Sequence, residues 1–110
     1  MTMAQYLLQY AYTSEAWSKQ LKTEDGDIGM ARKVAKNIGG SLVSGWFTFG
    51  DYDVAAIIEV PDHVTAAAVS VALSAAGYAR AAKTTLLMTE AEGKAMLKKA
   101  KSAKATPPTK

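Results

Sequence analysis

Hydrophobic residues recur at every second position in four stretches of the chain, a pattern that is typical of β-strands. In the first stretch, Tyr6, Leu8 and Tyr10 share one face of the predicted strand. In the second, the same period places Leu42 and Trp46 together on one face. We therefore predict strands over residues 5–12, 41–49, 52–60 and 78–88.

The second and third of these strands form a predicted β-hairpin. Gly50-Asp51 between them is typical of a two-residue turn. In the third strand Val54 and its alternate neighbours face one way, while Ala55 and Ile57 face the other, so both faces of the hairpin are apolar. An antiparallel sheet with one solvated face should alternate apolar and polar residues. We therefore expect both faces to be covered.

Helical spacing of hydrophobic residues predicts three helical segments. The first is a kinked or two-piece helix, with Trp17 and Leu21 on its inner side and Asp27 as the cap of its second piece. The second is apolar on nearly every side, which is typical of a helix buried on more than one side. The third opens on a capping-box pattern and turns Met96 and Leu97 inward. These segments cover residues 14–38, 63–76 and 90–101.

The predicted order is β-α-β-β-α-β plus a terminal helix, the ferredoxin-like plan of an α+β fold. Both crossover helices cover one face of the sheet in that plan, so the other apolar face is bare in a monomer. Such an exposed patch usually marks an interface, and a second copy related by a two-fold axis would cover it. We expect a homodimer packed sheet to sheet as a dimeric α+β barrel, with higher assembly through the alanine-rich helix 63–76.

The net charge of +3 is distributed unevenly along the chain. Residues 1–93 carry seven basic and ten acidic side chains, a net charge of −3, whereas residues 94–110 carry six lysines and no acid. A nucleic-acid-binding domain usually carries its basic patch on the folded surface, so nucleic acid is not expected as a partner. The lysines indicate a solubilising end; recruitment of an acidic partner is the alternative.

The absence of cysteine excludes disulfides, thiolate nucleophiles and cysteine-based metal or iron–sulfur sites. No signal-peptide pattern is evident, and no run of about 18 apolar residues would span a membrane. We therefore expect a cytoplasmic protein without a membrane partner. The sequence also lacks a phosphate-binding loop, a nucleophile dyad and a metal-ligand cluster, so no cofactor or metal is expected.

Three elements are spaced along the chain: Gly39-Gly40 before the second strand, Gly50-Asp51-Tyr52-Asp53 in the hairpin, and Glu59-Val60-Pro61-Asp62 after it. They resemble the GYD-domain family, which is named after its Gly-x-Tyr-Asp element. The resemblance implies the dimeric α+β barrel and little about chemistry, since structural relatives include cofactor-free monooxygenases, haem-binding enzymes and small-ligand binders. We divide the chain into a GYD-like ferredoxin-fold domain (1–89), a helical extension (90–101) and a disordered lysine-rich tail (102–110).

Two residues are weak candidates for catalysis. Asp53 opens the third strand, where it could act as an acid, a base or a ligand anchor. Turn chemistry favours the other interpretation, in which its carboxylate accepts hydrogen bonds from hairpin amides. His63 is the only histidine and so the only side chain with an ordinary pKa near neutrality. A histidine in the first turn of a helix is more often a solvated surface group.

Tyr10, Trp46 and Arg80 are candidate ligand-binding residues. Arg80 lies between alanines on the fourth predicted strand, where a covered arginine needs an anion. A salt bridge to Glu59 or Asp53 and the binding of an anionic ligand group are equally open. Tyr10 and Trp46 lie near strand centres. They could fill the core and the dimer interface, or line an apolar pocket with tyrosine hydroxyls aimed inward.

Together these features predict a homo-oligomeric GYD-like protein that binds a small molecule or forms an assembly without a cofactor. The alternative is a cofactor-independent enzyme, monooxygenase- or isomerase-like, that acts on a small apolar or aromatic substrate. Aromatic residues could line a pocket for either function, but no dedicated catalytic set accompanies them.

Overall fold

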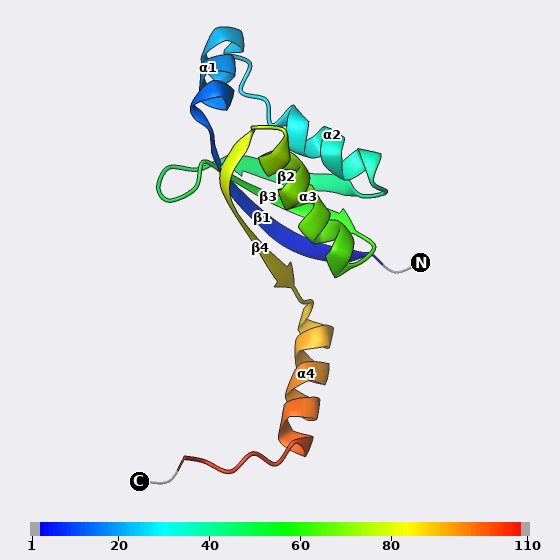
Figure 1. The fold of residues 1–110 in the computed structure, drawn as a ribbon. Coiled ribbons are helices and arrows are strands. Elements are labelled where there is room, and N and C mark those ends of the chain that lie inside the picture. Colours follow the sequence, from blue (N-terminus) through cyan, green and yellow to red (C-terminus); the bar gives the residue numbers. More distant parts are fainter. Residues whose placement is uncertain (1–2, 109–110) are drawn as a thin grey trace.

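A computed structural model describes residues 3–108 as a four-stranded antiparallel sheet with four helices (Figure 1). The strand order is β2-β3-β1-β4. This is the ferredoxin-like order, so the predicted α+β class and order of elements are confirmed. The strands are β1 (Ala4–Tyr12), β2 (Ser41–Phe47), β3 (Val54–Val60) and β4 (Ala79–Leu87). The helices are α1 (Ser14–Thr23), α2 (Gly29–Asn37), α3 (His63–Ala75) and α4 (Glu90–Ser102).

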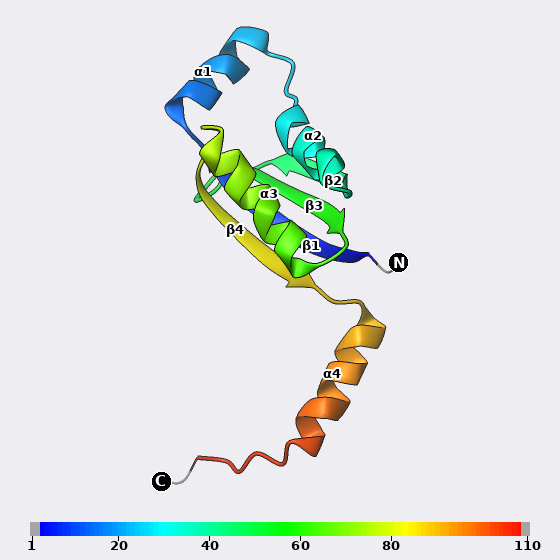
Figure 2. The ribbon, with the colours of Figure 1, turned by 45° about the vertical axis from the view of Figure 1, so that its right-hand side comes forward.

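The core lies between the sheet and the two helices α2 and α3, which Figure 2 shows on the same face. Burial alternates along β3, as its sequence pattern predicts, because every second side chain points to the helices. Tyr10 and Leu8 of the neighbouring strand β1 are also fully buried there. The other fully buried core residues of β3 and α3 are Val54, Ala56, Ile58, Val60, Val69 and Leu73.

The opposite face of the sheet, here called the open face, is mixed rather than uniformly apolar. Its centre is formed by Leu7 and Ile57, which lie directly opposite each other in the β1–β3 ladder. Trp46 lies beside Ala55 on the β2 side. No helix in the described part of the chain covers this face (Figure 2). The apolar area is narrower than expected, because alternate positions of β1 and β4 carry polar side chains, namely Gln5, Gln9, Lys83 and Thr85.

The predicted helix over residues 14–38 is two separate helices. Glu24 ends α1 in the left-handed conformation, with a φ of 54°. Asp27 does not cap α2, since its carboxylate pairs instead with Arg32 at 3.1 Å. The expectation that Trp17 and Leu21 face inward is wrong, because they are 40% and 75% exposed. Helix α1 extends beyond the end of the sheet and buries only its alanine, Ala16 (Figure 1).

The hairpin is wider than the predicted two-residue turn. The Thr48 amide donates to the Asp53 carbonyl at 2.8 Å, and the Thr48 hydroxyl donates to the Tyr52 carbonyl at 2.7 Å. These bonds close a loop over residues 49–52. A register shift between Leu42 and Ser44 interrupts the β2–β3 ladder. Leu42 therefore faces the helices while Trp46 faces the open side, and a period of two cannot reveal such a bulge.

Helix α4 projects away from the sheet, at the end of the molecule opposite to α1 (Figures 1 and 2). The predicted capping box joins Thr89 and Glu92. Met96 and Leu97 are 46% and 65% exposed, so the expectation that they face inward is wrong. The radius of gyration of 17.2 Å exceeds the value of about 13 Å for a compact chain of this length.

The segment after α4 forms neither helix nor strand over residues 104–108. The predicted disordered tail begins at Ser102, which is still the last residue of α4, and residues 109–110 lie outside the described part. Disorder of this end stays a prediction. Among the described residues, no helix combines the length and the apolar character needed to cross a membrane.

Candidate functional site

A cavity of about 300 Å³ opens between α1, α2 and the end of β1, and we call it the tyrosine pocket. Its volume is at the lower end of the range for small-molecule sites, about 300–1,000 Å³. The apolar part of its lining comes from Tyr10, Ala16, Ile28, Met30 and the ring of Tyr78. The polar part comes from Tyr12, Lys19, Gln20, Thr23, Asp25, Asp27 and Lys33.

Tyr12, the last residue of β1, is held in this pocket by its neighbours. Its ring packs edge to face against Tyr10, with centroids 5.5 Å apart, and against Trp17, with centroids 4.9 Å apart. The Gln20 side-chain amide donates to the Tyr12 hydroxyl at 3.2 Å and to the Asp27 carbonyl at 2.9 Å. Because the phenol oxygen accepts this bond, its hydrogen can be donated to a ligand.

Two of the tyrosines that line the pocket, Tyr10 and Tyr12, carry neutral phenols around neutral pH. Burial raises the pKa of Tyr10 and of Tyr12 above the ordinary value of 10.0, since desolvation disfavours the phenolate. Neither phenol is suited to act as a base at neutral pH. The pocket therefore offers the phenol hydrogen of Tyr12 to an acceptor atom of a ligand.

The raised pKa of Tyr10 predicts a loss of stability in alkali. Above about pH 10 the unfolded chain releases its tyrosine protons first, so the folded state binds more protons and the free energy of unfolding falls as pH rises. The slope reaches about 1.4 kcal/mol per pH unit for each such tyrosine. Urea unfolding from about pH 9 to 11 should show a shallower slope for Tyr10→Phe. Equal slopes for the variant and the wild type would contradict this cause.

Asp53 supports Tyr12 through the backbone. Its carboxylate accepts a hydrogen bond from the Tyr12 amide at 2.8 Å, and its own amide donates to the Tyr10 carbonyl at 2.9 Å. The expectation that it binds hairpin amides is thus corrected: the amide belongs to β1, where the ladder with β3 ends at Tyr10 and Val54. Asp53 is therefore a positioning residue for the pocket.

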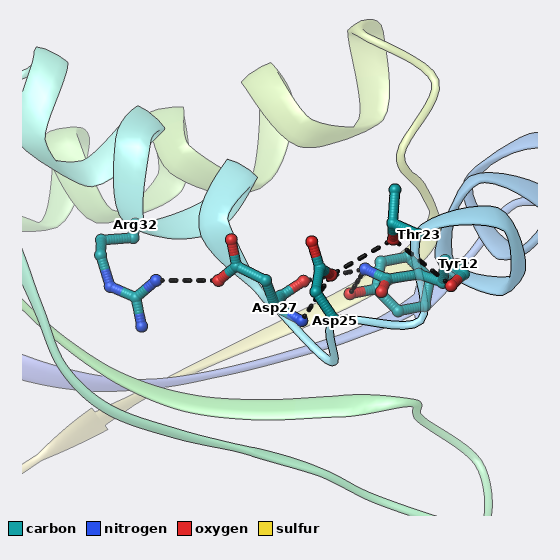
Figure 3. A network of polar contacts seen from close by, with 6 residues as sticks. Tyr12, Thr23, Asp25, Asp27 and Arg32 are labelled. Carbon is teal, nitrogen blue, oxygen red and sulfur yellow. Dashed lines mark hydrogen bonds and ion pairs between the residues drawn. The ribbon is translucent and has the colours of Figure 1, made fainter.

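The two carboxylates that line the pocket are engaged by residues of α1, α2 and the loop between them (Figure 3). Asp25 accepts from the Thr23 hydroxyl at 3.2 Å and from the Asp27 amide at 3.3 Å. Asp27 pairs with Arg32. Two lysines also line the pocket, and Lys19 donates to the Tyr78 hydroxyl at 3.2 Å. Across residues 3–108, no group of three or more histidine, cysteine, aspartate and glutamate side chains could hold a metal ion.

The structure does not bring the three predicted ligand-binding residues together. Only Tyr10 lines the tyrosine pocket. Trp46 lies on the open face and is 54% exposed. Arg80 is exposed on the edge strand β4, at a register shift opposite Ala11 and Tyr12, so it needs no buried anion. Within residues 3–108 it forms no ion pair with Glu59 or Asp53.

His63, the other catalytic candidate, is exposed at the first position of α3 and does not line the tyrosine pocket. The preceding residue, Asp62, caps the helix by accepting from the Thr65 amide at 2.8 Å. Roles for His63, Trp46 and Arg80 stay predictions. Sequence reasoning missed Tyr12 and Gln20. The available signal was the position of Tyr12 directly before the helix cap Thr13, where a strand end opens beside the next helix.

Comparison with known families identifies the chain through one domain. The sequence model of the GYD domain matches residues 6–97 and so reaches into α4. Comparisons with curated proteins and with solved structures give no match. The match covers most of the described sheet and helices, including the Gly50-Asp51-Tyr52-Asp53 loop. The chain belongs to the GYD domain family.

Proposed function

We propose that this GYD-family protein is a homodimer that binds a small ligand in the tyrosine pocket, through an oxygen atom that accepts hydrogen bonds. The observation that carries the proposal is the Tyr12 hydroxyl, which accepts from Gln20 at 3.2 Å and keeps its own hydrogen for a ligand. Burial keeps this phenol protonated, since it raises the pKa of Tyr12.

The remaining lining indicates the chemistry of the ligand. Lys19 and Lys33 add positive charge to the lining. The carboxylate of Asp25 already accepts from Thr23, and that of Asp27 pairs with Arg32. A carbonyl or carboxylate oxygen suits these donors. Aromatic and aliphatic groups form the opposite wall, and a cavity of about 300 Å³ has room for a single ring. A small aromatic acid or ketone therefore fits the pocket best.

The proposed dimer rests on the open face. Leu7 and Ile57 form an apolar centre, and polar side chains surround it, including the Gln5 amide that donates to Glu59 at 3.0 Å. An apolar centre with a polar rim is typical of protein interfaces. We further propose that α3 serves any larger assembly, because its outer side carries an exposed stripe of small apolar residues: Val64, Ala67, Ala68 and Val71.

Binding has more support than catalysis. A cofactor-independent monooxygenase or isomerase would need a base next to the bound substrate. Burial keeps the phenols of Tyr10 and Tyr12 neutral, and His63 does not line the pocket. The enzyme alternative therefore rests on the fold family alone, which carries no chemistry of its own.

Replacing Tyr12 by phenylalanine should weaken the binding of benzoate about 5- to 10-fold, which corresponds to one hydrogen bond of about 1 kcal/mol. Trp17 reports on this site, because its ring lies 4.9 Å from that of Tyr12. Titrations should follow tryptophan fluorescence in a Trp46→Phe background, which removes the other tryptophan.

Two controls belong to this titration. Tyr6→Phe removes the hydroxyl of a tyrosine outside the pocket lining and should bind benzoate as the wild type does. Toluene, which has no acceptor oxygen, should bind Tyr12→Phe and wild type alike. Equal benzoate affinities for Tyr12→Phe and wild type would contradict the proposed site.

A further inference from the structure

We propose that α4 of each chain docks on the partner chain in the dimer, against an apolar patch at its α1 end. This patch, here called the α1 patch, consists of Trp17, Leu21 and Phe47. The inference rests on the proposed homodimer. It adds that the C-terminal helix of one chain covers a surface next to the other chain's tyrosine pocket.

Helix α4 has an apolar stripe, and nothing within residues 3–108 of its own chain buries it. Gly93, Met96, Leu97 and Ala100 recur at spacings of three and four residues and so share one side of the helix. A helix shorter than about 12–15 residues is marginal in water without tertiary packing. The capping box at Thr89 fixes where α4 starts, but only a second surface can cover the stripe.

The α1 patch is a surface of complementary character. Trp17, Leu21 and Phe47 are 40%, 75% and 43% exposed and line an open hollow of about 380 Å³. Its lining is almost entirely apolar, with Glu24 at the edge. Such a cluster of large exposed hydrophobic side chains usually marks a contact site.

Electrostatics favours this pairing. Four lysines flank the stripe on α4: Lys94, Lys98, Lys99 and Lys101. Glu24 lies at the edge of the patch and Asp25 follows it in the α1–α2 loop, whereas Asp27 is already paired with Arg32. The whole chain repeats this asymmetry, with a net charge of −3 over residues 1–93 and six lysines over residues 94–110. Opposite charges at the rim of an apolar contact align the partners and speed their association.

Geometry requires a second chain. The α1 and α4 ends lie at opposite ends of a molecule 56 Å long (Figures 1 and 2), so α4 cannot reach the patch of its own chain without leaving its position. A two-fold axis that lies parallel to the sheet and perpendicular to the strands runs the two copies antiparallel. It brings the α4 end of each chain to the α1 end of the other.

Docking would also complete the tyrosine pocket. Gln20, which holds the Tyr12 hydroxyl, lines both the pocket and the hollow of the α1 patch. A helix seated on the patch would exclude water from that side of Gln20 and hold α1 in place. The ligand site of one chain would then depend on a residue of its partner, such as Leu97.

Disulfide trapping tests the contact in a chain that has no cysteine of its own. In the double variant Leu21→Cys/Leu97→Cys, mild oxidation of the purified protein should give a covalent dimer on a non-reducing gel. Each single variant should stay monomeric on that gel. The matched control is Lys36→Cys/Leu97→Cys, which places the first cysteine at an exposed position of α2 and should not cross-link.

Three results would overturn the inference: no cross-link, a cross-link within one chain, or equal dimer formation by the control. Sedimentation of the wild-type protein distinguishes a failure of the α4 contact from a failure of the proposed homodimer. If the wild type sediments as a dimer but Leu21→Cys/Leu97→Cys does not cross-link, only the placement of α4 is overturned. A monomer at micromolar concentration overturns the homodimer as well.

Discussion

Replacing Ile57 by aspartate should convert the proposed dimer to a monomer. Ile57 lies opposite Leu7 at the apolar centre of the open face, where a partner sheet would enclose it. An unpaired carboxylate enclosed in this way costs several kcal/mol, which corresponds to a dissociation constant raised at least about 100-fold. The monomer should still fold, because this side chain points away from the core between sheet and helices.

Sedimentation velocity across the micromolar range measures this effect. Val71→Asp is the matched control, since it puts the same charge on an exposed branched residue of α3. This variant should keep the dimer and lose only larger assemblies. If Ile57→Asp stayed a dimer and Val71→Asp became a monomer, the interface would lie on α3. This result would contradict an interface on the open face.

Replacing Asp53 by alanine should lower both stability and ligand affinity. The change leaves the Tyr12 amide without its acceptor at 2.8 Å, and a part-buried unpaired amide costs about 1–3 kcal/mol. Tyr12 then loses its fixed position, so benzoate binding should also weaken. Urea unfolding and the fluorescence titration measure the two effects.

Two variants separate the role of Asp53 from that of charge in the hairpin. Asp53→Asn keeps a side-chain oxygen that can accept from the Tyr12 amide and should recover most of the stability. Asp51→Ala removes an exposed carboxylate from the same loop and should have little effect. If Asp53→Ala bound benzoate as tightly as the wild type, Asp53 would not position the pocket.

The parts of the fold that depend on local chemistry could be predicted from the sequence. Alternation along β3 gave its buried face, from Val54 to Val60. Thr89 was recognisable as a helix cap, because it places a side-chain oxygen next to unpaired first-turn amides. From these elements and the turn residues between them, the ferredoxin-like order followed.

The features that depend on tertiary geometry could not be predicted. The bulge at Val43 moves Trp46 to the open face, and the register shift in the β1–β4 ladder leaves Arg80 exposed at an edge. The orientation of α1 relative to the sheet decides whether Trp17 and Leu21 are buried. The spacing of hydrophobic residues along the helix gives no information on that orientation. The tyrosine pocket depends on the same orientation, because it lies where α1 diverges from α2 beyond the end of the sheet.

The GYD loop has a clearer role in the structure than in the sequence. From the sequence, Asp53 was expected to act within the turn, by accepting hydrogen bonds from hairpin amides. Its carboxylate instead extends the β1–β3 pairing by one hydrogen bond and fixes the strand end that carries Tyr12. The family motif and the candidate ligand site are therefore joined by the two hydrogen bonds that Asp53 forms with Tyr12 and Tyr10.

Native mass spectrometry of the protein purified from its own source is the most direct test of a homodimer with a small ligand in the tyrosine pocket. It measures the mass of the assembly and of any bound ligand in one experiment. One chain has a mass of 11.6 kDa. We expect a species of twice that mass that carries a small non-covalent ligand. The Tyr12→Phe variant, prepared in the same way, should retain less of this ligand. A bare monomer at micromolar concentration, for both proteins, would contradict the account.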